Sequence, residues 1–263
     1  MREPLQDSPR SLTEHLEELR RRLGFGLAAV LVGIGVSLTQ VDWLMGLLLR
    51  PAPPRLARLA FFSPVEPLTA YLKVAALAGV ILAMPVLLWQ LWAFVQPGLT
   101  RRERRHGLLF IWSGSALFVG GVIFAYAVLL PLSLRVLLSV GAGRLEPMIS
   151  VDRYVGFVTT LAFWCGVTFE LPAVLLALTR IGLVTPEWLR QQRAYAVLVL
   201  VILAAILTPT TDVATLALVT VPLVVLYELS IWLARGFVRP RQAAEYPRPA
   251  ERAQPAQDPP AHS

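Results

Sequence analysis

Four glutamates stand at positions where an acidic side chain needs an explanation. Glu170 and Glu228 lie inside long apolar segments, and Glu18 lies in a charged run directly ahead of the first one. Glu103 is the single acid in the run RRERR. An ionisable group near the centre of a bilayer is penalised by about 2.5 to 3.5 kcal/mol on insertion scales, so it usually serves a function. These acids indicate binding or transport through carboxylates.

Residues typical of catalysis are not placed where the apolar segments could use them. The histidines His15, His106 and His262 fall outside those segments, and the sequence contains no HExxH motif for zinc. Ser115 and Ser133 lie in an apolar segment, but no histidine there could activate them. A glycine-rich phosphate loop is also absent. An intramembrane hydrolase and a nucleotide-driven pump are therefore disfavoured, and we expect no metal, no cofactor and no enzymatic activity.

Two interpretations of Glu18 and Glu103 remain open on residue types alone. Arg22 lies four residues after Glu18, so an ordinary ion pair on a helix surface would account for Glu18. The arginines beside Glu103 would account for it in the same way. Alternatively, two carboxylates held apart on one surface could each receive one guanidinium through charge-assisted hydrogen bonds. The ligand would then be a peptide with paired arginines.

The two acids inside apolar segments also have simple explanations. Pro172 removes a backbone donor and frees the carbonyl of Thr168, to which a protonated Glu170 could donate a hydrogen bond. The alternative is a function for Glu170 within the membrane. Glu228 lies late in its segment, where it reads as a solvated acid at a helix end.

The composition is that of a membrane protein. The 263 residues are 56% hydrophobic and 16% charged, and the mean hydropathy is +0.62. A soluble domain of this composition would expose large apolar patches. The net charge of +7 does not indicate nucleic acid, because the basic residues flank apolar segments and form no patch with aromatic residues. The single cysteine, Cys165, excludes an intramolecular disulfide.

The apolar segments predict an all-α membrane protein with six spans. Leucines recur every three or four residues over 11–22, with charged residues between them. This spacing predicts an amphipathic helix on the membrane surface. We expect Pro85 and Pro131 to bend the second and third spans, and Lys73 to reach the interface from the second. The predicted parts are a cytoplasmic segment 1–22, a membrane domain 23–238 and a disordered tail 239–263. The spans are about 23–41, 70–94, 108–138, 154–178, 194–207 and 213–234, the last two short and paired as an antiparallel hairpin.

The distribution of basic residues predicts the orientation. Four segments, 1–22, 95–107, 179–193 and 235–263, together hold 17 Lys and Arg, whereas the intervening segments hold four. Loops rich in Lys and Arg remain in the cytoplasm. Both termini are therefore expected on the cytoplasmic side.

Long ordered stretches resemble one family, the TatC-type core subunit of the twin-arginine protein translocase. The resemblance covers nearly all of residues 11 to 238. Its carriers include HLEELRRRL at 15–23, SPVEPLTAYLKVA at 63–75, PVLLWQLWAFVQPGLTRRERR at 85–105, GVTFELPAVLLAL at 166–178 and PLVVLYELSIWL at 222–233.

The resemblance implies a cup-shaped receptor of six spans in the plasma membrane of a prokaryote, without a catalytic centre. It would bind the twin-arginine signal peptides of folded proteins and export those proteins using the proton gradient. Single-span TatA- and TatB-type subunits would dock along the short fifth and sixth spans, and the receptor would self-associate.

The resemblance also assigns residues. It places the acids that contact the arginine pair at Glu18 and Glu103, with Arg20 and Phe94 beside them. Glu170 matches an acid of the fourth span that lines the concave face and disturbs the bilayer. Further family-matched positions are Glu66, Lys73, Asp212 and Glu228. The turn TPTTD at 208–212 departs from the pattern, since relatives often have the shorter TPPD.

A proton-coupled secondary transporter that uses Glu170 is the alternative function. Such a transporter predicts an internal repeat with broken helices at matching positions. The sequence shows no convincing repeat.

Overall fold

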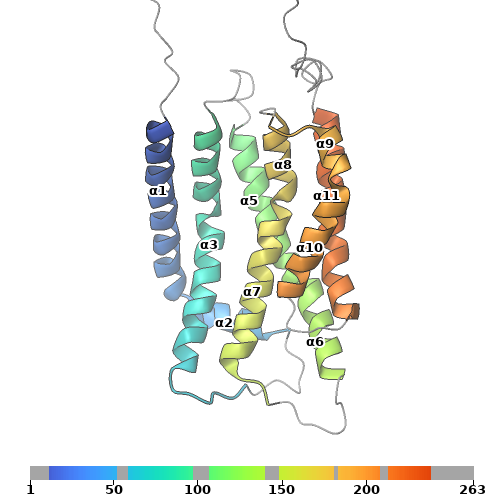
Figure 1. Ribbon diagram of the computed structural model, residues 1–263. Coiled ribbons are helices and arrows are strands. Elements are labelled where there is room, and N and C mark those ends of the chain that lie inside the picture. The colour runs from blue at the N-terminus through green and yellow to red at the C-terminus, as the bar shows by residue number, and fades with distance from the viewer. Residues whose placement is uncertain are drawn as a thin grey trace, which may run out of the picture.

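The computed structural model describes residues 12–51, 59–96, 107–139, 148–180, 183–207 and 213–237, and they form a bundle of helices (Figure 1). In these ranges the only extended pairing is an isolated bridge between Ala60 and Ser150. The fold class is therefore all-α, as predicted. In chain order the elements are α1 (Leu12–Leu38), α2 (Val41–Leu49), α3 (Glu66–Val95), α5 (Gly107–Phe124), the π-helical turn η3 (Ala125–Leu129), α6 (Leu130–Ser139), α7 (Val151–Phe169), α8 (Leu171–Arg180), α9 (Pro186–Gln191), α10 (Arg193–Leu207) and α11 (Val213–Phe237).

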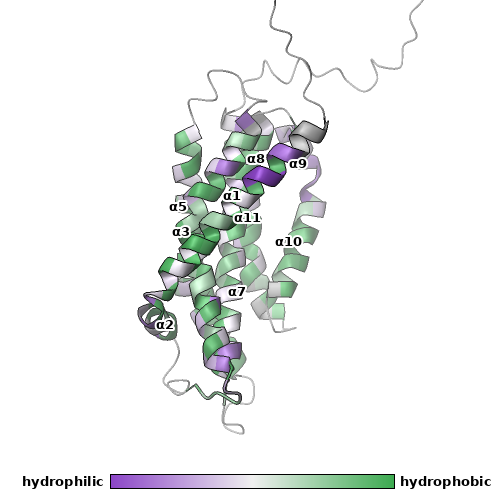
Figure 2. Cartoon of the chain, turned by 90° about the vertical axis from the view of Figure 1, so that its left-hand side faces the viewer, coloured by the Kyte–Doolittle hydropathy of each residue, from purple (hydrophilic) through white to green (hydrophobic). Residues whose placement is uncertain are grey.

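Helix α1 is one continuous helix, so the expected separate surface helix over 11–22 is wrong. The charged run and the first apolar segment share a single axis from Leu12 to Leu38. No proline or glycine lies between Leu12 and Leu23 to break the helix. The charged turns therefore extend beyond the apolar part of the same helix (Figure 2).

Helix α1 packs on α3 through two glycines. A Cβ atom added to Gly33 would lie 2.5 Å from the carbonyl oxygen of Gly79, and one added to Gly79 would lie 2.6 Å from the amide nitrogen of Ile34. Small residues let two membrane helices bring their backbones into contact, which supplies dispersion where lipid offers no hydrophobic driving force. The outer face of α1 carries exposed side chains such as Phe25, as expected for a lipid-facing helix.

Pro131 and Pro85 were both expected to bend their spans, but only Pro131 lies beside a departure from the regular α-helix. Before Pro131 the helix widens into the turn η3, in which the amide of Leu130 donates to the carbonyl of Ala125. A π-type turn accommodates the ring of a proline that would clash in a regular α-helix. Pro172 lies just after the junction of α7 and α8, and Glu170 occupies that junction. Pro85, in contrast, lies inside the unbroken α3.

The short helix α2 was not predicted from the sequence. It follows two turn residues after α1 and consists mostly of apolar residues, with Met45 and Leu48 buried. Two tyrosines from other helices hold its end, because the hydroxyl of Tyr126 donates to the carbonyl of Leu47 at 2.6 Å and that of Tyr154 donates to Leu48 at 3.3 Å. The stretch after the first span is therefore part of the packed structure.

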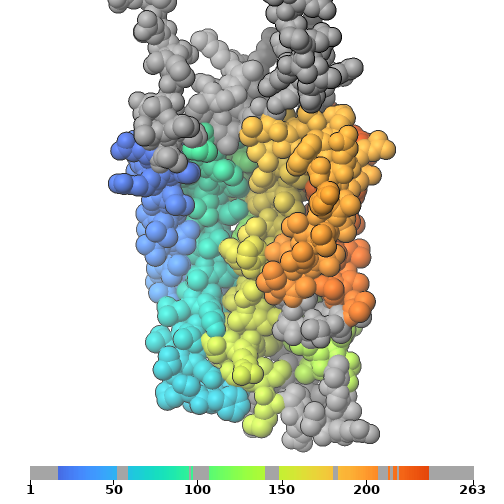
Figure 3. All heavy atoms as spheres, viewed as in Figure 1, coloured from blue at the N-terminus to red at the C-terminus, as the bar shows by residue number. Residues whose placement is uncertain are grey.

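Five stretches are long and apolar enough to span a membrane: Glu17–Leu38, Glu66–Phe94, Gly107–Ser139, Val151–Thr179 and Val219–Gly236. The predicted fifth span corresponds to α10, whose 15 residues cover about 22 Å of a core about 30 Å thick. Its lower end stops well short of those of α3 and α7 (Figure 3). The partner α11 has 25 residues, so only one of these two spans is short.

Helix α7 contributes most to the larger of the two buried hydrophobic clusters, with Val155, Leu161 and Cys165 nearly inaccessible. It contacts α3, α5, α10 and α11. The first turn of α1 and the last turn of α11 lie at the same end of the bundle, the upper end in Figure 1. This agrees with termini on one side of the membrane, and the side itself stays a prediction.

Candidate functional site

The upper end of the bundle carries three of the four predicted ligand-binding residues. Glu18 and Arg20 lie in the first turns of α1, and Phe94 lies in the last turn of α3. Glu103 lies outside the described residues. The chain leaves α3 after Gln96 and re-enters α5 at Gly107, at this same end (Figure 1).

Packing of α1 on α3 brings Glu18 and Phe94 to a common height. Gly33 lies against Gly79, and a Cβ atom on Gly26 would lie 3.1 Å from Leu87, so the two helices run antiparallel in a defined register. Continued for two turns, this register places Glu18 level with Phe94. The glycine contacts deep in the membrane therefore set the height of the acid at the surface.

The carboxylate of Glu18 pairs with Arg22 of its own helix. The Nε and Nη2 atoms of Arg22 donate to Oε1 of Glu18 at 3.1 and 2.5 Å. The side chains of Glu18 and Arg22 keep only 16% and 20% of their exposure, so this pair is more shielded than a typical surface pair. Arg20 is exposed on the same helix. The ordinary ion pair considered from the sequence is therefore present.

Glu170 is 6% exposed and lies at the junction of α7 and α8. A Cβ atom on Gly114 of α5 would lie 3.0 Å from Oε2 of Glu170 and 2.6 Å from Leu88 of α3. The carboxyl group therefore lies over the bare backbone at Gly114. Neither of its oxygens has a hydrogen-bond partner in the part of the chain that the structure describes. The predicted hydrogen bond to the carbonyl of Thr168 does not form.

Glu228 is not the simple solvated acid expected from the sequence. Its Oε2 atom accepts a hydrogen bond from Nη2 of Arg193 at 2.6 Å. Arg193 is the first residue of α10, so the pair joins the start of the short helix to the late part of α11. The hydroxyl of Tyr227 donates to the carbonyl of Leu189 at 2.9 Å and so joins α11 to α9, the helix that precedes α10. The expected hairpin of the last two spans is thus tied at its upper end.

A polar cluster lies at the opposite end of the bundle. Nζ of Lys73 and the hydroxyl of Thr69 both donate to Oδ1 of Asp152 at 2.6 Å. The hydroxyl of Ser150 donates to Glu66 at 2.6 Å. Glu66 and Lys73 were predicted from the resemblance, whereas Thr69, Ser150 and Asp152 were missed. These partners are about 80 residues apart, and helical spacing carries no signal for such pairs.

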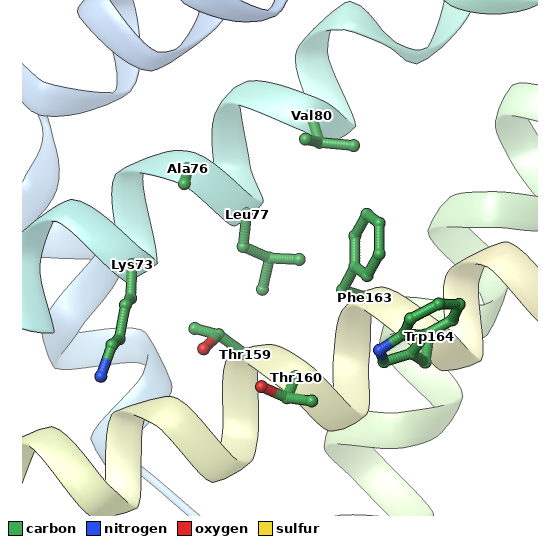
Figure 4. A pocket seen from close by; sticks show the side chains of 8 residues that line it. All are labelled: Lys73, Ala76, Leu77, Val80, Thr159, Thr160, Phe163 and Trp164. Carbon is green, nitrogen blue, oxygen red and sulfur yellow. The ribbon is translucent and has the colours of Figure 1, made fainter. Parts of the chain in front are cut away.

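A groove of about 290 Å³ runs between α3 and α7 next to this cluster (Figure 4). Its lining is mostly apolar, with Leu77, Val80 and Phe163 facing it, and Lys73 stands at one end. Across the described ranges, no three His, Cys, Asp or Glu side chains cluster in a way that could hold a metal ion. The remaining predicted position, Asp212, lies outside those ranges.

Residues 14–222 match the family model described as Sec-independent protein translocase protein (TatC). The curated TatC of Carboxydothermus hydrogenoformans is 37% identical over 90% of this chain and 98% of its own length. That of Deinococcus radiodurans is 40% identical over 86% of each chain.

A solved structure described as the twin-arginine translocase receptor TatC superposes with a TM-score of 0.76. The two chains are 37% identical in sequence. The match covers 86% of this chain and 100% of the solved chain. The match gives no support to the alternative of a proton-coupled transporter. Sequence, length and fold agree, and this chain belongs to the TatC family of Sec-independent protein translocase proteins.

Proposed function

We propose that the upper end of the bundle is a receptor site for the paired arginines of a signal peptide, with Glu18 and Glu103 each taking one guanidinium. Family membership makes the chain a multi-pass component of a bacterial inner-membrane protein translocase and not an enzyme. The solved relative is described as a twin-arginine translocase receptor. The proposal carries that role to this chain and to named residues.

One observation carries the proposal. The carboxylate of Glu18 already holds a guanidinium through two donors, at 3.1 and 2.5 Å. The surroundings of Glu18 therefore accommodate the group that a guest arginine would bring. A planar guanidinium can offer two donors in a fixed fork, whereas a lysine ammonium is a compact charge that holds its own water strongly. Such a site prefers arginine to lysine.

Arg20 and Phe94 complete the proposed site. Phe94 stands level with Glu18 through the register of α1 on α3 and offers an aromatic face on which a guanidinium can stack. Arg20 is exposed on the same helix as Glu18. The resemblance assigns both residues to the site, and the register of α1 on α3 supports the place of Phe94.

The same proposal includes partners of the receptor. TatA- and TatB-type subunits with one span would dock where α10 is short, next to an apolar hollow of about 310 Å³ lined by Trp188, Tyr195 and Val199. Folded precursor proteins would cross the membrane in the assembly, with the proton gradient as the energy source. Receptor chains would also associate with one another.

The decisive experiment compares signal peptides carrying Arg-Arg or Lys-Lys for binding to the purified full-length chain. Glu18→Ala and Glu103→Ala should each weaken Arg-Arg binding by roughly 10- to 150-fold, because a hydrogen bond to a charged group is worth about 1.5 to 3 kcal/mol. Glu17→Ala is the matched control, since Glu17 is an exposed acid one residue from Glu18. Equal binding of both peptides by all four proteins would overturn the assignment.

A further inference from the structure

We propose that Arg22 is an internal competitor for the site, which occupies the carboxylate of Glu18 in the empty receptor and must leave before a guest arginine can bind. This inference rests on the proposed function, because it concerns the affinity of the same site. It assigns to Arg22 a role that differs from that of Arg20. Arg22 sets how tightly peptides bind and does not read their sequence.

The geometry indicates that Arg22 occupies the carboxylate of Glu18 and does not merely lie near it. Two nitrogens of Arg22 converge on one oxygen of Glu18, and both side chains are about four-fifths shielded. The spacing of four residues holds the partners on one face of α1 in every conformation in which α1 stays helical. The local concentration of this arginine at Glu18 is therefore high and permanent. A guest guanidinium binds only by exchange.

Occupancy by Arg22 stabilises the empty receptor by compensating the charge of Glu18. A shielded carboxylate without a partner is unfavourable, because removing one partner of such a pair leaves an uncompensated charge. Arg22 supplies that compensation until a peptide arrives. After exchange its long side chain can turn its charged end to water, since α1 lies at the edge of the bundle with α3 as its main neighbour among the described helices. Glu18 thus has a guanidinium partner both before and after binding.

Exchange also makes a specific prediction about selectivity. Any peptide that uses Glu18 must displace Arg22, whether it carries arginine or lysine. Removing Arg22 should therefore tighten the binding of both peptides by the same factor and leave the ratio of their affinities unchanged. A residue that contacted the peptide directly would change that ratio.

The test measures dissociation constants of Arg-Arg and Lys-Lys signal peptides with the full chain and its Arg22→Ala variant. We expect both peptides to bind roughly two- to fivefold more tightly to the variant, the range that corresponds to a partly exposed ion pair. Arg21→Ala is the matched control, because Arg21 is exposed in the same turn and carries the same charge. It should not tighten binding, which separates loss of competition from loss of charge.

A second variant guards against a folding defect. Arg22→Lys keeps the charge but offers no fork of donors, so it should be a weaker competitor and give intermediate affinity. Weaker binding by Arg22→Ala, with thermal unfolding unchanged, would overturn the inference and make Arg22 part of the peptide contact. Tighter binding of only one of the two peptides would also overturn the inference. A wild-type chain that does not distinguish Arg-Arg from Lys-Lys would instead refute the proposed function.

Discussion

The carboxyl group of Glu170 lies directly over Gly114, where any larger residue would fill the space that the acid occupies. A Cβ atom at Gly114 would approach Oε2 of Glu170 to 3.0 Å. Neither oxygen of the acid finds a hydrogen-bond partner among the residues that the structure covers. A buried polar group without a partner lowers stability and persists where it serves a function.

The first prediction separates stability from activity at Glu170. Glu170→Met removes the unpartnered polar group at similar volume, and should raise the free energy of unfolding by about 1 kcal/mol. Export of a twin-arginine substrate should fall in the same variant. Denaturant unfolding of the purified chain and an export assay in cells measure the two effects. The control is Glu187→Met, whose exposed acid on α9 should leave both nearly unchanged.

The outcome for Glu170→Gln decides what the acid does. Glutamine keeps the shape and the hydrogen-bonding capacity but cannot ionise. Full export by this variant would show that ionisation at this position is dispensable. Loss of export with unchanged unfolding would assign the function to the ionisable group. A Glu170→Met variant that is less stable than wild type would contradict the view that the acid is unpartnered.

The second prediction concerns the contact of Gly33 with Gly79. Gly33→Ala places a methyl group 2.5 Å from a backbone oxygen of α3, so the helices must move apart. Overpacking of this kind destabilises by about 1 to 3 kcal/mol. Because the same contact sets the height of Glu18, peptide binding should weaken together with stability. Thermal unfolding in detergent and peptide titration check both effects.

Gly35→Ala provides the control for this contact. Gly35 lies on the same helix, but a Cβ atom there meets nothing within 4 Å. Its stability and peptide binding should equal those of the wild type. Alanine has a higher helix propensity than glycine, so propensity cannot lower the stability of either variant. Equal destabilisation by Gly33→Ala and Gly35→Ala would therefore show that the contact with α3 is not the cause.

The third prediction concerns the ion pair between Lys73 and Asp152. A double-mutant cycle with Lys73→Met and Asp152→Asn should give a coupling free energy of about 0.2 to 1 kcal/mol. The value is modest because the side chains remain 40% and 29% exposed. Asp152→Asn should be the more harmful single change, since it also weakens the bond from Thr69. Arg153→Gln, an exposed neighbour of Asp152, is the control and should show no coupling to Lys73.

The sequence predicted those features of the fold that depend on the residues of a single segment, such as the ends of apolar helices. The end of the fifth span at Leu207 and the start of the sixth at Val213 agree with α10 and α11, because long apolar runs have clear limits. Pro131 was expected to bend its span and lies beside the π-helical turn, whereas Pro85, for which the same was expected, lies inside the continuous helix α3. The sequence did not reveal this difference, since it depends on how neighbouring helices pack around the freed backbone groups.

The contacts between distant segments could not be predicted in this way. The partner of Lys73 is 79 residues away, and the space over Gly114 exists only because α5 lies beside α7. The helix α2 was missed because a proline-rich stretch follows it, although its own run VDWLMGLLL is apolar and contains no proline. The pairing of Glu18 with Arg22 was readable because both residues lie on one helix.

The last prediction concerns the bond that ties α10 to α11. Arg193 and Glu228 are 2.6 Å apart, and their side chains are 43% and 45% exposed, so the pair adds little to global stability. Its effect should be local, because α10 is too short to be held by the bilayer alone. Arg193→Glu or Glu228→Arg should speed hydrogen exchange in the first turns of α10, and the combination of both should restore protection. Arg235→Gln, an exposed residue in the last turn of α11, is the control. Slow exchange in both single variants would show that this ion pair does not hold the start of α10, and that the bond from Tyr227 to the carbonyl of Leu189 in α9 is enough.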